Sequence, residues 1–324
     1  MKQLIVNADD FGLTRGVNRA IVECYQRGIL TSTTLMANSR EFDDAISAIK
    51  SLGHAIERDA SPGTRNSGLS RPALSVGCHV VLVDGEPVLP PSEVRSLLVP
   101  GTNRFYRSAQ QLVRCAISGR FRAEEVEAEA LAQFRKIQKV GIAISHFDAH
   151  KHAHIFPSIL KPLLKAAAAC GIAALRNPFE PVFSMPLPGL LRIPVRYAEV
   201  IALRSFRAKF NAMVAASGLR TTDGSLGLIA TGTLNQTAAA ALLDRMQDGV
   251  WELVCHPGYA DAELANAGTR LIASRETEMQ ALTAPGTQHA LQRNGIGLIS
   301  FAELLAVSAT HGDQGRRALD PKAQ

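Results

Sequence analysis

Short apolar segments alternate with longer amphipathic segments along this chain, and this alternation limits the folds open to it. The apolar segments predict strands at 3–8, 32–38, 75–83, 142–148, 173–177, 225–231 and 250–256. Helical patterns lie at 16–28, 41–52 and 123–141. Strands that alternate with helices form a parallel sheet with crossover helices. Six or more such units, with no linker between two halves, favour a barrel over an open sheet.

Two segments depart from this alternation. Residues 54–74 are rich in Ser, Gly, Pro and Arg and predict a surface loop inserted before the third strand. Residues 309–324 are polar and predict a frayed tail. We therefore expect one domain over residues 1–308 that carries this insertion, followed by the tail.

Composition excludes several classes of protein. With 46% hydrophobic and 20% charged residues, the chain is typical of a soluble globular protein. An acidic pair within the first ten residues leaves no room for a secretory signal, and no apolar run reaches membrane-span length, so we expect a cytoplasmic protein. The five cysteines form no CxxC pair and argue against a disulfide framework. The net charge of +6 is scattered and aromatic residues are few, so no nucleic-acid partner is expected.

Polar residues gather where the predicted strands end. The stretch SHFDAHKHAH, at 145–154, holds four of the nine histidines of the chain. Because the carboxyl ends of parallel strands meet at one edge, residues that follow different strands can share a site. The residues at or near these ends are Asp9, Asp10, His79, Asp148, His150 and His256. An ionisable group there costs several kcal/mol unless it is paired or bound to a metal.

One carboxylate with two imidazoles is a common ligand set for a divalent cation. Zn²⁺ takes such ligands with water completing its coordination, and Mg²⁺, Co²⁺, Ni²⁺ or Fe²⁺ are alternatives. Neighbouring residues in a straight strand point to opposite faces, so Asp9 and Asp10 could not both face one site. The Phe-Gly pair that follows them predicts a break in the strand, which would let both reach it. One carboxylate could then bind the metal while the other moves a proton.

Each of these residues also has a simpler interpretation. An Asp-Asp pair after a strand can serve as a helix cap, and His79 can be a buried core histidine. The residues expected to orient a ligand or line the site are His146, Asp148 and His152. His154 is expected to be structural, whereas His54, His289 and His311 are expected at the surface. Cys78 and Cys255 adjoin key histidines, but strand alternation should turn them away as inert core thiols.

Four motifs together resemble those of the YdjC-like carbohydrate deacetylases, a family that includes chitooligosaccharide and hopanoid-biosynthesis-associated deacetylases. The motifs are IVNADDFGLT, GCHVVL, SHFDAHKHAHIFP and ELVCHPG, and the resemblance covers about residues 3 to 305. It implies a single-domain α/β fold, a distorted (β/α) TIM-like barrel, often dimeric. It also implies a hydrolase that removes acetyl groups from N-acetylated sugars with one divalent metal ion. We expect this ion to be Zn²⁺ or Mg²⁺.

The resemblance also assigns roles to residues. Asp9 matches the general base of the family, Asp10, His79 and His150 match its metal ligands, and His256 matches the expected general acid. The continuation VDGEPVLPP after His79 resembles the hopanoid-associated branch, so the acetylated sugar could be lipid-linked. The predicted helix at 190–210 interleaves basic and apolar residues and could rest on an anionic membrane, although a solvated helix fits it as well.

Other functions remain open at this stage. A metal phosphoesterase also uses clustered Asp and His, but it usually bridges two metals with more carboxylates. A glycosidase that uses Asp9 and Asp10 fits poorly, because adjacent residues seldom reach the required carboxylate separation of roughly 5 Å. A non-catalytic sugar- or metal-binding protein is the alternative from another class, and Asp9 argues against it because binding metal alone would not require this carboxylate.

Overall fold

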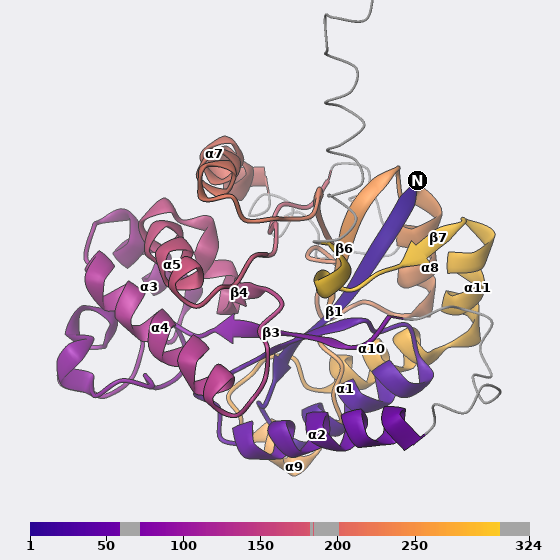
Figure 1. Ribbon diagram of the computed structural model, residues 1–324, viewed down its shortest axis with the longest axis horizontal. Coiled ribbons are helices and arrows are strands. Elements are labelled where there is room, and N and C mark those ends of the chain that lie inside the picture. The colour runs from indigo at the N-terminus through magenta and orange to yellow at the C-terminus, as the bar shows by residue number, and fades with distance from the viewer. Residues whose placement is uncertain (59–71, 182–183, 185–200, 305–324) are drawn as a thin grey trace, which may run out of the picture.

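Seven parallel strands form one curled sheet in the computed structural model, which describes residues 1–58, 72–181, 184 and 201–304 (Figure 1). Their spatial order is β4-β3-β2-β1-β6-β5. Strand β7 pairs with the N-terminal end of β1, at Lys2 to Leu4. The strands are β1 Lys2–Phe11, β2 Ser32–Leu35, β3 Ser75–Val80, β4 Phe147–Ala149, β5 Gly224–Leu226, β6 Gly249–Cys255 and β7 Ile296–Leu298. The predicted parallel α/β arrangement is confirmed.

Short backbone bridges carry the sheet on from β4 toward β5. Phe147 pairs with Leu175, and Ala174 pairs with Arg220, which lies four residues before β5 begins. The amide of Leu175 donates to the carbonyl of Arg220 at 2.9 Å. Since β5 then pairs with β6, these bridges complete a distorted ring, in agreement with the predicted barrel.

Helices surround this ring on its outside (Figure 1). They are α1 Arg15–Arg27, α2 Phe42–Arg58, α3 Ala109–Ile117, α4 Ala123–Lys139, α5 Pro157–Ala169, α7 Arg207–Ser217, α8 Gln236–Arg245, α9 Ala262–Ala265, α10 Ala273–Thr283 and α11 Pro285–Arg293. Helix α1 begins where the Thr14 hydroxyl accepts a hydrogen bond from the amide of Val17 at 3.1 Å, a standard N-cap. Strand β1 is buried from Leu4 to Phe11, as expected for a parallel strand covered on both faces.

Two predicted segments differ from the structure at their boundaries. Helix α2 continues to Arg58, so the start of the expected 54–74 loop is helical; Gly53 is tolerated within it, and residues 59–71 lie outside the described part. The strand expected at 142–148 is regular only from Phe147, although the amide of Ser145 still donates to Val76 of β3 at 2.9 Å.

The expected basic helix at 190–210 is described only from residue 201. A 3-10 turn occupies Arg204–Phe206, and α7 begins at Arg207. The Arg204 guanidinium donates to the carbonyl of Glu180 at 3.1 Å, so this basic side chain is engaged with the protein. Membrane contact through this segment and a homodimer stay predictions, and the tail at 309–324 lies outside the described residues. Among the described helices, none is long and apolar enough to cross a membrane.

Candidate metal centre

A bulge at the end of β1 brings two adjacent carboxylates to one side. The register between β1 and β2 shifts between Ala8 and Phe11, and Asp10 has a left-handed backbone with φ of 65°. A short polar side chain such as Asp tolerates this conformation better than most residues. The Phe-Gly pair therefore follows an irregular strand end, as the sequence predicts. Asp9 and Asp10 are both buried, at 3% and 4% exposure.

Asp10, His79 and His150 bring three potential donor atoms together. The Asp10 Oδ1 lies 3.6 Å from His79 Nε2 and 3.5 Å from His150 Nδ1, and the two nitrogens are 3.0 Å apart. Ligand atoms bound tetrahedrally at about 2.1 Å lie about 3.4 Å from one another. The observed separations bracket that value, so this donor set fits a divalent metal ion. His150 belongs to the 3-10 segment His150–Ile155, which follows β4 directly.

The orientation of His79 is fixed from behind. Its Nδ1 lies 2.7 Å from Asp148 Oδ1 and 3.3 Å from the Thr34 hydroxyl. Burial alone would lower the pKa of His79, but the Asp148 carboxylate outweighs it and raises that pKa to about 9. Because Nδ1 is engaged by Asp148, Nε2 is left for a metal, the arrangement expected of a carboxylate behind a histidine ligand.

A fully buried arginine, Arg176, ties three carboxylates together. Its guanidinium donates to both oxygens of Asp9, at 2.6 and 2.7 Å, and to Glu252 at 2.7 and 2.8 Å. It is also paired with Asp148. Burial would raise the pKa of Asp9, but Arg176 outweighs it and holds that pKa far below its ordinary value. Burial prevails at Glu252 and raises its pKa to about 7.

This arginine also separates two sets of donors. Among the described residues, Asp9, His79 and Asp148 form a second three-donor group that shares His79 with the first. Both carboxylates of the second group already neutralise Arg176, whose charge would repel a cation placed between them. The group of Asp10, His79 and His150 is therefore the better metal site.

His256 faces Asp9 from the loop after β6. Its Nε2 lies 3.8 Å from Asp9 Oδ2, and its Nδ1 lies 3.8 Å from a Glu278 oxygen. The same Glu278 carboxylate accepts a hydrogen bond from the backbone amide of His256 at 2.6 Å. Burial would lower the pKa of His256, but Glu278 and then Asp9 raise it above its ordinary value. An imidazole that holds its proton near neutral pH can act as an acid.

The remaining histidines of the cluster divide into different environments. His146 donates from Nε2 to Asn7 at 3.1 Å, and Asn7 donates to Asp9 Oδ1 at 3.0 Å, so His146 reaches Asp9 through one residue. Its ring stacks on Phe301 with centroids 3.7 Å apart. Among the described residues, Nδ1 of His152 has no hydrogen-bond partner. His154 is fully buried, and neither of its ring nitrogens has a hydrogen-bond partner in the described part of the chain.

The other expected surface and core residues can be placed in part. His289 is exposed, as predicted, whereas the side chain of His54 and all of His311 lie outside the described part of the chain. Cys78 and Cys255 are fully buried, and burial raises the pKa of each thiol well above its ordinary value. The prediction of inert core thiols agrees with this environment.

Sequence reasoning missed four charged residues of the site: Arg176, Glu252, Arg275 and Glu278. Arg176 and Glu252 carried a signal, because each is a lone charge within an apolar segment predicted as a strand, AALRN and VWELVCH. Such a charge needs a buried partner. Arg275 and Glu278 lie in the polar segment ASRETEMQALT, where charged residues are ordinary and gave no signal.

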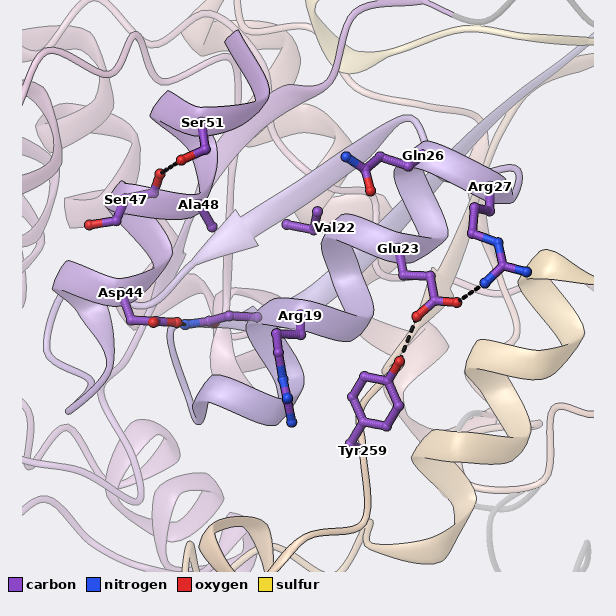
Figure 2. A pocket seen from close by; sticks show the side chains of 11 residues that line it. Arg19, Val22, Glu23, Gln26, Arg27, Asp44, Ser47, Ala48, Ser51 and Tyr259 are labelled. Carbon is purple, nitrogen blue, oxygen red and sulfur yellow. Dashed lines mark hydrogen bonds and ion pairs between the residues drawn. The ribbon is translucent and has the colours of Figure 1, made fainter. Parts of the chain in front are cut away.

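A surface groove of about 520 Å³ lies elsewhere, between α1 and α2 (Figure 2). Two of its charged groups are paired: Glu23 accepts from Arg27 at 2.5 Å, and it also accepts from the Tyr259 hydroxyl at 2.5 Å. None of the residues predicted to form the site lines it. The groove is therefore separate from the metal centre.

Comparison with known proteins gives consistent matches over nearly the whole chain. A sequence profile described as YdjC-like protein matches residues 3–293. A Brevibacillus brevis (strain 47 / JCM 6285 / NBRC 100599) protein named carbohydrate deacetylase is 30% identical over 303 residues, covering 93% of this chain and 99% of that protein. A protein of the same name from Thermoanaerobacter pseudethanolicus (strain ATCC 33223 / 39E) is 28% identical, covering 94% and 100%.

A solved structure resembles the fold as well. The crystal structure of an Enterococcus faecalis V583 protein, provisionally named for cellobiose-phosphate cleavage, superposes with a TM-score of 0.69 at 26% identity. The match covers 94% of this chain and 98% of that protein. The two chains therefore share one fold over most of their length.

Proposed function

The chain belongs to the YdjC-like family, and we propose that it is a metal-dependent carbohydrate deacetylase that hydrolyses the N-acetyl group of an amino sugar. The observation that carries the proposal is the placement of Asp9, whose pKa is lowered, and His256, whose pKa is raised, beside the donors Asp10, His79 and His150. The names of the curated relatives support a carbohydrate substrate and an acetyl group.

Asp10, His79 and His150 would hold the metal. A divalent cation there supplies Lewis acidity, which polarises an acetyl carbonyl and makes a water molecule more acidic. Asp148 contributes by holding the His79 ring so that Nε2 faces the other two donors. The fit favours an ion that accepts nitrogen ligands, such as Zn²⁺, although Mg²⁺ and other divalent ions stay in the proposal.

Asp9 would take the proton of the attacking water. Its pKa, lowered by Arg176, keeps it ionised and ready to accept a proton across the ordinary pH range. The same low pKa makes it a weak base, so it can act only on a water that is already more acidic than bulk water. This dependence explains why the proposed base lies beside a metal site rather than alone.

His256 would deliver a proton to the departing amine. The amide C–N bond breaks poorly unless the nitrogen is protonated, and the Glu278 carboxylate helps to keep His256 charged for this task. The 3.8 Å between His256 Nε2 and Asp9 Oδ2 supports a joint role for these two groups. Asp9 would end the reaction protonated and His256 would end it neutral, so the transfer of one proton from Asp9 to His256 would restore both groups.

The alternatives from the sequence have less support. A two-metal phosphoesterase would need a second set of donors, and among the described residues the second set is already neutralised by Arg176. A protein that only binds metal or sugar would have no use for a buried base paired with a buried acid. The metal-dependent deacetylase accounts for both groups.

Acetate release by the metal-loaded protein tests the proposal. The panel would contain free N-acetylglucosamine, its disaccharide, and lipid-linked N-acetylglucosamine glycosides, which also tests the predicted lipid-linked substrate. We expect acetate from at least one member, and its loss on addition of a chelator. Phosphate release from sugar phosphates without any acetate release would instead favour the phosphoesterase.

A further inference from the structure

Arg275 of helix α10 reaches the metal centre from outside the recognised motifs. Its Nη2 lies 2.5 Å from Asp10 Oδ2, while the other oxygen of Asp10 faces His79 and His150. The side chain of Arg275 is 1% exposed. This ion pair is therefore fully desolvated and holds one oxygen of a carboxylate whose other oxygen is offered to the metal.

The stem of Arg275 is held along its length. Its Nε donates to the carbonyl of Leu271, one turn earlier, at 3.0 Å. A Cβ atom on Gly258 would lie 2.9 Å from the Arg275 Cδ, so the glycine of the His-Pro-Gly motif leaves the space through which the arginine passes. The Gly258 amide also donates to the Arg275 carbonyl at 3.3 Å. The Nη1 atom has no partner among the described residues, so the contact with Asp10 fixes the tip.

Helix α10 is itself tied to the loop after β6. Arg275 and Glu278 are three residues apart and so lie on one helix face. Glu278 accepts hydrogen bonds from the backbone amides of His256, at 2.6 Å, and Gly232, at 3.1 Å. Glu276 accepts from the amide of Ala260 at 3.0 Å. These contacts hold helix α10 in place, so that Arg275 can position Asp10.

We propose that Arg275 is a positioning residue that restricts Asp10 to binding the metal through Oδ1 alone. The inference rests on the proposed metal site. A free carboxylate can bind a metal through one oxygen or both, and the contacts of Asp10 with His79 and His150 both involve Oδ1. Because Arg275 occupies Oδ2, Asp10 presents a single oxygen, which suits a metal of low coordination number with positions left open for water and substrate.

Two effects of Arg275 on metal affinity have opposite signs, which makes the inference testable. If Arg275 acts through orientation, its removal weakens binding, typically 10- to 100-fold for a residue that orients a ligand. If it acts only through its positive charge, its removal strengthens the binding of a cation. The measured direction therefore distinguishes positioning from simple repulsion.

The experiment is a titration of the metal-free protein with Co²⁺. Calorimetry measures the affinity, and visible absorption reports the coordination of the ion. Arg275→Gln is compared with Arg275→Lys and with Arg270→Gln, a control at an exposed arginine just before the same helix. We expect Arg275→Gln to bind 10- to 100-fold more weakly and to show a weaker, higher-coordinate Co²⁺ spectrum, Arg275→Lys to recover part of both, and the control to match the wild type.

Unchanged or tighter binding by a folded Arg275→Gln variant, with an unchanged spectrum, would overturn the inference while leaving the metal site intact. Absence of Co²⁺ binding by the wild type would refute the metal site itself. If Arg275→Gln does not fold, Gly258→Ala serves instead, because it displaces the stem of Arg275 without removing its charge. It should show the same spectral change in smaller degree, and an unaltered spectrum would count against the inference.

Discussion

Replacing Arg176 with Met should strongly destabilise the protein, and the loss should grow with pH. Arg176 is fully buried and pairs with Asp9, Asp148 and Glu252, so the substitution leaves three buried carboxylates without their cation. Breaking a buried ion pair by removing one partner costs about 3–5 kcal/mol. We expect at least this loss in the free energy of unfolding at pH 8, where all three groups favour ionisation in the unfolded chain.

The pH dependence follows from the carboxylates. In the wild type the pKa of Asp9 is lowered, so this group contributes stability that is present above its unfolded pKa and lost as the pH falls through the folded value. In Arg176→Met the main cause that opposes burial is gone, and only His79 and His256 still lower the pKa of Asp9. That pKa should therefore rise above its unfolded value, which reverses the sign: the variant loses stability as the pH rises. The difference between variant and wild type should therefore be smaller at pH 5 than at pH 8.

Urea denaturation in chelator at these two pH values measures the difference. Trp251, the single tryptophan of the chain, lies in β6 next to Glu252 and is 8% exposed, so its fluorescence should report unfolding near the cluster. Arg293→Met is the matched control, because Arg293 pairs with Asp244 at 2.6 Å on the surface, with 54% and 45% exposure. It should change stability by less than about 0.5 kcal/mol. Equal losses for both variants, or a loss from Arg176→Met that does not depend on pH, would refute the reasoning.

Three further predictions concern the proposed base, the proposed acid and the packing of two glycines. Asp9→Asn should keep metal binding but lower kcat by about 10²- to 10⁴-fold, and loss of metal would show that Asp9 is a ligand instead. His256→Gln should remove the alkaline limb of the rate profile, because His256 must be protonated to act and its pKa is raised above the ordinary histidine value; an unaltered limb would exclude it as the acid. Gly77→Ala should lower the free energy of unfolding by about 1–3 kcal/mol, since a Cβ there would lie 2.5 Å from the His146 ring. Gly53→Ala, in open space on α2, should leave stability unchanged or raise it. Thermal melts that rank the two variants the other way would contradict the packing.

Periodicity was sufficient to predict the order of the principal strands and helices and their parallel arrangement. It failed where local pattern and tertiary pairing disagree. The strand expected at 142–148 has its apolar residues in place, but regular pairing begins only at Phe147. The ring then closes through single bridges at Leu175 and Arg220, which no periodicity within a short segment could specify. The extension of α2 to Arg58 was missed because residues 54–74, rich in Ser, Gly, Pro and Arg, were interpreted as a loop from their first residue.

The donors of the candidate site could be predicted from the sequence, whereas the residues that support them could not. Its donors lie at the ends of strands, where a charged residue after an apolar segment is visible in the sequence, so Asp10, His79 and His150 could be proposed together. Their supports could not be, because they depend on how distant helices pack. Arg275 reaches Asp10 across 265 positions of the chain, from a helix whose composition is that of any exposed helix. Only the folded chain relates the two.

A parallel titration of metal content and acetate release tests most directly whether one bound metal ion is required for deacetylation. The metal-free wild type and His150→Ala would be titrated with Zn²⁺ in the presence of the best acetylated substrate. Wild-type activity should rise in proportion to bound metal and saturate at one equivalent, while His150→Ala should neither bind metal nor release acetate under the same conditions. Full activity in the metal-free protein, or saturation only at two equivalents, would contradict this prediction.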